Sequence, residues 1–210
     1  MKLQFLLIIL FMLTQAVYGQ RNKSADPPPP VLTKWEQKIE AESRQCAKKD
    51  LISLKERLKK YPFNVASRIQ FVSFNHDIYL LNREMVEQDS LQHINDSIIY
   101  SKLKEIKTVT HFQIDQLTDL FYNYGYKGPV SSFSEAGCYM PRNAILFLDS
   151  KGKILELIEI CFECRKMYAS SDKVSFGEMC DQKMSMLFDL FKKAGIIYGI
   201  TKGRIFGNEQ

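Results

Sequence analysis

The chain has 210 residues, of which 45% are hydrophobic and 25% charged, and its formal net charge is +5. This length is sufficient for one domain with a buried core. Basic and acidic residues are interspersed, without the basic stripe and interleaved aromatic side chains that nucleic-acid binding requires. We therefore expect no nucleic-acid partner.

The first 19 residues have the pattern of a cleavable signal peptide. Lys2 is their only charge, an apolar run covers residues 3–13, and Val17 and Gly19 fit the small-residue pattern before a cleavage site. The apolar run is shorter than the roughly 20 residues that cross a bilayer. We expect an exported protein, periplasmic or secreted, with no transmembrane segment in the mature chain.

Residues 20–32 are expected to form a proline-rich tether. Four consecutive prolines at positions 27–30 favour an extended conformation and cannot begin an α-helix. A single domain is expected over residues 33–203, followed by a C-terminal tail over residues 204–210.

The domain is expected to begin with two helices. Thr33 and Glu36 have capping-box spacing, which predicts a helix from Thr33. The apolar residues change face near Asp50, so a second helix should begin there and stop at Pro62.

The middle of the chain predicts a strand, a mixed segment and a helix. Residues 68–74 are β-branched and aromatic with period-two character, which predicts a strand. Residues 75–110 fit neither period well and are expected to hold an edge strand and an irregular helix. Residues 113–124 carry one helical apolar stripe that ends at Gly125.

The last third predicts a hairpin, a helix and a strand. Strands at residues 143–149 and 153–161 are joined by a loop with Gly152 where a positive φ is needed. A helix is expected over residues 175–194, with a capping box from Ser175 and Glu178, and a strand over residues 196–200. The whole order predicts an α+β fold, with a mostly antiparallel sheet, helices packed on one face and a central β-hairpin at residues 143–161.

Four of the five cysteines are expected to converge at the open end of this hairpin. They are Cys138, Cys161, Cys164 and Cys180. Cys46 lies far from the others in sequence and is expected to be left unpaired.

Hairpin geometry is the reason for this expectation. We expect Leu148 to face Lys153 across the loop. Counting outward from this pair places Cys138 on one strand between Cys161 and Cys164 on the other. Cys180 would then join them from the first turn of the following helix.

Three chemistries suit such a cluster, and four ordinary buried cysteines remain a fourth interpretation. Two disulfides are favoured, because an exported protein meets an oxidising compartment. A Cys₄ metal site would use Cys161 and Cys164 as a chelating pair, with zinc as the expected ion. A redox site would use the same pair, but no amphipathic helix begins there, as thioredoxin-like sites require. Cys180, at a predicted helix start, is a better candidate for a reactive thiol.

Other candidate site residues are few. Arg142 lies beside the cluster and is expected to pair with Glu163 across the hairpin, with anion binding as the alternative. His76, His93 and His111 are scattered among different elements. The familiar signatures of serine hydrolases, phosphate-binding loops and zinc proteases do not occur.

The cysteine region also carries a resemblance. The run from Cys138 to Phe147 has the form Cys-Tyr-x-Pro-Arg-x-Ala-Ile-x-Phe, and residues 160–164 read Ile-Cys-Phe-x-Cys. This signature resembles that of a group of small exported proteins from Bacteroidetes-type bacteria, over roughly residues 110–200. The resemblance implies a shared fold and a shared reason for the cysteine cluster, and it implies no activity.

These observations favour a non-enzymatic exported module of binding or structural type, stabilised by the cysteine cluster. Its partner would be an unknown protein or small ligand, and no cofactor is expected unless the cluster holds zinc. The alternatives are an exported thiol–disulfide oxidoreductase that uses Cys161 and Cys164, and a Cys₄ metal-binding protein.

Overall fold

A computed structural model of the chain describes residues 32–49, 51–75, 103–130 and 138–200. The predicted signal peptide, nearly all of the tether, the C-terminal tail, His76 and His93 lie outside these residues. The chain divides into two compact units, Met1–Lys34 and Trp35–Gln210, and the second contains all the described strands. Within the described residues, no helix has the length and apolar character to cross a membrane.

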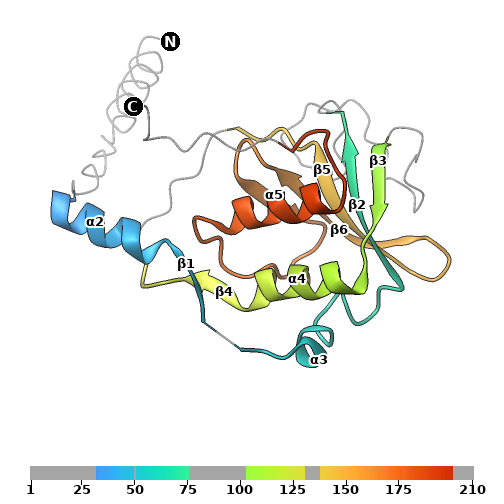
Figure 1. Ribbon diagram of the computed structural model, residues 1–210, viewed down its shortest axis with the longest axis horizontal. Helices are drawn as coiled ribbons and strands as arrows, with labels where there is room; N and C mark the ends of the chain where they lie inside the picture. The colour runs from blue at the N-terminus through green and yellow to red at the C-terminus, as the bar shows by residue number, and fades with distance from the viewer. Residues whose placement is uncertain (1–31, 50, 76–102, 131–137, 201–210) are drawn as a thin grey trace, which may run out of the picture. The chain divides into compact units, whose positions relative to one another are not determined.

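Among the described residues, two antiparallel sheets form the β-structure (Figure 1). The larger has five strands in the order β3-β2-β5-β6-β7, and the smaller pairs β1 with β4. Their bounds are β1 (Cys46–Lys48), β2 (Arg68–Phe74), β3 (Leu103–Thr108), β4 (Tyr124–Tyr126), β5 (Asn143–Leu148), β6 (Ile154–Cys161) and β7 (Lys166–Ala169). The predicted α+β class with a mostly antiparallel sheet is confirmed, and β3 is the expected edge strand.

The described helices are α2 (Lys34–Ser43), α3 (Leu54–Arg57), α4 (His111–Tyr122) and α5 (Lys183–Lys193). Helices α4 and α5 lie over one face of the large sheet (Figure 1) and share its main core. In that core Phe71 of β2 stacks on Phe191 of α5, with ring centroids 4.1 Å apart. Each fully buried side chain of this kind contributes about 1.5–3 kcal/mol. A smaller apolar cluster, which includes Val72 and Leu146, lies on the opposite face.

The central hairpin is confirmed, but its register differs from the expected one. Asn143 pairs with Ile160, whereas the predicted register pairs it with Ile158, two residues earlier. The carboxylate of Asp149 accepts the backbone N–H groups of Lys151 and Lys153, and a bulge follows Phe147. These side-chain bonds widen the loop, which the strand pattern does not encode.

The last predicted helix and strand are partly wrong. Helix α5 begins at Lys183 rather than at residue 175, because Glu178 accepts the N–H of Tyr126 at 2.7 Å instead of capping a helix. Gly177 adopts φ +68°, which no helix allows. Residues 196–200 contain a turn at 198–199 and no strand, since the backbone N–H groups of Ile197 and Tyr198 donate to Glu105.

The predicted helix over residues 50–62 is also wrong. Residues 46–48 form strand β1, and only the four residues of α3 are helical, capped by the hydroxyl of Ser53. The side chain of Asn123 bonds both the N–H and the carbonyl of Ile52 and holds that segment extended. Long-range contacts therefore override the local helical pattern here.

Candidate functional site

The cysteines form two disulfides that join segments far apart in sequence. Cys46 of β1 pairs with Cys180, just before α5, and the separation is 134 residues. Cys138, before β5, pairs with Cys164, in the turn after β6, and the separation is 26 residues. The unpaired cysteine is Cys161, which is buried, so the expectation that Cys46 is unpaired is wrong.

The β1–β4 sheet explains the pairing of Cys46. This sheet places Cys46 opposite Tyr126, and Tyr126 in turn bonds Glu178, two residues before Cys180. The side chain of Gln182 also accepts the N–H of Cys46 at 2.6 Å. These contacts leave the Cα atoms of Cys46 and Cys180 4.9 Å apart, within the range of a disulfide.

The predicted four-cysteine site therefore divides into two. Cys138, Cys161 and Cys164 lie together at the end of the hairpin, as expected, while Cys180 is bonded to Cys46. Within the described residues, no group of three or more His, Cys, Asp or Glu side chains has an arrangement that could hold a metal ion.

The free thiol of Cys161 lies against the backbone of the neighbouring disulfide. Its Sγ accepts the N–H of Cys164 at 3.3 Å and the N–H of Met140 at 3.5 Å. Cys161 ends strand β6, and the turn after it closes with Arg165 at φ +54°. Only 1% of Cys161 is exposed, whereas Cys138 is at the surface.

The predicted ion pair beside the cluster is confirmed. Arg142 and Glu163 approach to 2.5 Å, with side chains that are 23% and 40% exposed. A pair so open to water contributes at most about 1 kcal/mol. Its role is to fix the start of β5 against the turn that carries Cys164.

Two buried glutamates on β6 were not among the predicted site residues. Glu159 accepts the hydroxyl of Tyr139 at 3.0 Å, and Tyr139 directly follows Cys138 in sequence. Glu156 lies three residues earlier and is also buried. Their signal in the sequence is an acidic residue within an otherwise apolar strand, which costs free energy unless the carboxylate is hydrogen-bonded.

Glu156 is saturated by hydroxyl groups. It accepts hydrogen bonds from Tyr61 at 2.6 Å, from Ser171 at 2.8 Å and from Ser170. Burial opposes its ionisation, but the hydrogen bonds outweigh burial and hold the pKa of Glu156 below its ordinary value. The hydrogen bond between Tyr61 and Glu156 raises the pKa of Tyr61 to about 12. A carboxylate with both oxygens occupied is suited to holding β6 and the loop after β7 together, rather than to proton transfer.

Lys183, in the first turn of α5, is fully buried. Its Nζ donates to the carbonyl oxygens of Phe176, at 2.9 Å, and Phe121, at 3.5 Å. Burial penalises the ammonium group and lowers the pKa of Lys183 to about 8, although the Glu178 carboxylate opposes the shift. This lysine ties the last turn of α4 to the loop before α5.

The lowered pKa of Lys183 predicts a pH dependence of stability. Between about 8 and the ordinary value of 10.5, the unfolded chain binds more protons than the folded chain, so the free energy of unfolding rises with pH. Between pH 8 and about pH 9.5 we expect the free energy of unfolding to rise by about 1–2 kcal/mol. The variant Lys183→Met should lack this gain in urea denaturation at several pH values. Parallel profiles for the two proteins would contradict this assignment.

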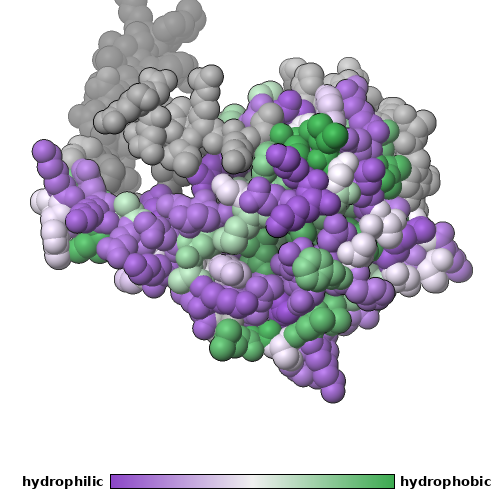
Figure 2. All heavy atoms as spheres, viewed as in Figure 1, coloured by the Kyte–Doolittle hydropathy of each residue, from purple (hydrophilic) through white to green (hydrophobic). Residues whose placement is uncertain are grey.

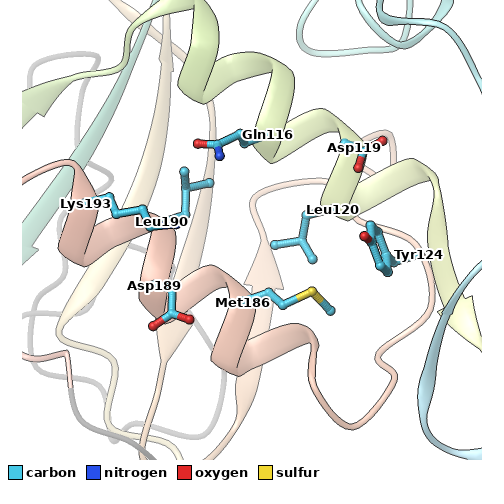
Figure 3. A pocket seen from close by; sticks show the side chains of 8 residues that line it. All are labelled: Gln116, Asp119, Leu120, Tyr124, Met186, Asp189, Leu190 and Lys193. Carbon is cyan, nitrogen blue, oxygen red and sulfur yellow. The ribbon is translucent and has the colours of Figure 1, made fainter.

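A groove of about 240 Å³ lies between α4 and α5 (Figure 3). Its floor is apolar, with Leu120, Met186 and Leu190, and Asp189 and Lys193 stand along α5. This volume is below the roughly 300–1,000 Å³ of drug-sized ligand sites. The charged groups of its lining are the carboxylates of Asp119 and Asp189 and the ammonium group of Lys193. Figure 2 shows a mainly hydrophilic face with scattered apolar patches.

The fold and the cysteine site together define an α+β protein that carries two disulfides and one buried free thiol. Comparison with known protein families, curated proteins and solved structures finds no match to this chain. The resemblance to small exported bacterial proteins therefore stays a prediction.

Proposed function

We propose that this protein is an exported, non-enzymatic module of binding or structural type, stabilised by its disulfides. The observation that carries the proposal is the pair of disulfides, which join segments 134 and 26 residues apart. Such bonds form and persist in oxidising compartments and are rare in the cytosol. They agree with the signal peptide that the first 19 residues predict.

The cysteine geometry favours a structural role over thiol catalysis. An oxidoreductase needs a nucleophilic thiol that a substrate can reach. Here the unpaired Cys161 is buried, and the bridge that the oxidoreductase alternative requires, between Cys161 and Cys164, is not the one present. If the module binds a ligand, the groove between α4 and α5, with its apolar floor, is the candidate binding site.

Alkylation of the denatured mature protein tests the proposal. Without reduction, one cysteine should be labelled, and after reduction all five, as intact mass would record. Five labels in both samples would show that the disulfides are absent and would remove the basis for an oxidising compartment.

A second measurement separates the module from the oxidoreductase. The purified protein should not accelerate the oxidation of dithiothreitol by glutathione disulfide above the uncatalysed rate. Turnover that is lost on Cys161→Ser or Cys164→Ser would overturn the non-enzymatic proposal and establish the alternative.

A further inference from the structure

Three sulfur atoms occupy the end of the hairpin, although one disulfide uses only two of them. The odd sulfur, of Cys161, is in the same turn as Cys164, and its Sγ lies 3.3 Å from the backbone nitrogen of Cys164. The N–H of Met140, two residues after Cys138, also donates to this Sγ. The free thiol is therefore held against the backbone of Cys164, one half of the disulfide, and against the segment that follows Cys138, the other half.

Two backbone N–H groups, of Cys164 and Met140, donate to this one sulfur and hold it in place at the end of the hairpin. The thiolate is the form that attacks a disulfide. Burial keeps external reagents away from Cys161, so the reaction open to this thiolate is with the disulfide beside it.

We propose that Cys138, Cys161 and Cys164 exchange one disulfide among themselves. The Cys161 thiolate attacks Sγ of Cys164, the Cys161–Cys164 bond forms, and the Cys138–Cys164 bond breaks. The electron pair of the broken bond leaves on Cys138, which takes up the proton that Cys161 released. One disulfide replaces another, so no oxidant or reductant is consumed.

The exchange moves the free thiol from the interior to the surface. Cys161 is 1% exposed, whereas Cys138 is exposed. In the first form the free thiol belongs to the buried Cys161. In the second form it belongs to Cys138 at the surface. The class of partner that this second form can take is a protein with an accessible disulfide: Cys138 joins one of its sulfurs in a mixed disulfide, the other sulfur leaves as a thiol, and the product is a stable attachment rather than turnover.

Alkylation of the folded protein tests the exchange. The native chain is treated with iodoacetamide, quenched with acid, and mapped by peptide mass spectrometry. We expect the label on Cys138, together with a Cys161–Cys164 bridge, and no label on the folded variant Cys161→Ala. Cys46 and Cys180 serve as internal controls and should stay bridged in both proteins. No label, or a label on Cys161 with the Cys138–Cys164 bridge intact, would overturn the proposal.

The variant Cys138→Ser tests the second form directly and does not depend on how Cys161→Ala folds. With Cys138 removed, Cys161 and Cys164 should join in the folded variant under a glutathione disulfide buffer, with loss of two hydrogens in mass. Two free thiols in the folded, oxidised variant would show that the alternative bridge cannot form. Neither result changes the one-label count expected of the denatured wild-type chain, so failure of the exchange is distinguishable from failure of the proposed function.

Discussion

Replacing Cys46 and Cys180 together with alanine is expected to lower the free energy of unfolding by about 5 kcal/mol, since their disulfide closes a loop of 134 residues. A long closed loop restricts the unfolded chain more than a short one. The same model gives about 3.5 kcal/mol for the bridge between Cys138 and Cys164, which are 26 residues apart. The loss of about 5 kcal/mol expected for the Cys46–Cys180 bridge equals the whole free energy of unfolding of a marginally stable domain, because native domains are stable by only about 5–15 kcal/mol.

Urea denaturation of the two double-alanine variants and the wild-type protein measures this difference. The expected order is a larger loss for the Cys46/Cys180 variant than for the Cys138/Cys164 variant, with the second as the matched control. The reverse order would show that local packing around each sulfur, rather than loop length, decides the stability.

Replacing Arg57 with leucine is expected to cost about 3 kcal/mol, near the lower end of the range for breaking a buried ion pair. Arg57 is 5% exposed, and its Nη1 lies 3.1 Å from the carboxylate of Asp119 and 3.2 Å from the carbonyl oxygen of Asp115. Its Nη2 pairs with the Asp115 carboxylate. The side chains of Asp119 and Asp115 are 24% and 42% exposed, so water compensates part of the loss. This network joins α3 to α4.

The pH dependence of the Arg57→Leu variant gives an independent check. Burial raises the pKa of Asp119, but hydrogen bonds from Lys48 and Asn123 and the charges of Lys48 and Arg57 outweigh it, so the pKa lies below its ordinary value of 3.8. A lowered carboxyl pKa stabilises the fold above 3.8, and this contribution is lost as the pH falls through the folded pKa. The gap in stability between wild type and variant should therefore narrow in acid.

Arg68→Leu is the control for this prediction. Arg68 is exposed at the start of β2, and its replacement should change the free energy of unfolding by no more than about 0.5 kcal/mol. Chemical denaturation at neutral pH compares the two variants. If Arg57→Leu cost no more than Arg68→Leu, the buried network would not contribute to stability.

The strongest local patterns in the sequence predict elements that the structure contains. β2 has the expected bounds, because alternating β-branched and aromatic side chains suit a pleated sheet. Helix α4 begins two residues earlier than its apolar stripe suggests, because Thr110 and Gln113 form a capping box. The Arg142–Glu163 pair was predicted from the hairpin alone, and it forms although the register is shifted.

In the cysteine site, local sequence patterns predict some contacts and not others. The neighbours Cys138, Cys161 and Cys164 could be placed together, because two adjacent strands and one turn bring them there. The partner of Cys180 could not be found in the same way. It depends on β1, a strand of three residues with no pattern of its own, which forms only because β4 lies beside it.

The sequence by itself determined the fold class, the central hairpin and the meeting of three cysteines, because periodicity and turn chemistry act over a few neighbouring residues. Tertiary structure decided which cysteine stays free, where α5 begins, and how Glu156 and Lys183 are satisfied in the interior. Each of these depends on a contact between segments distant in sequence, and such a contact forms only after the sheet and helices have packed.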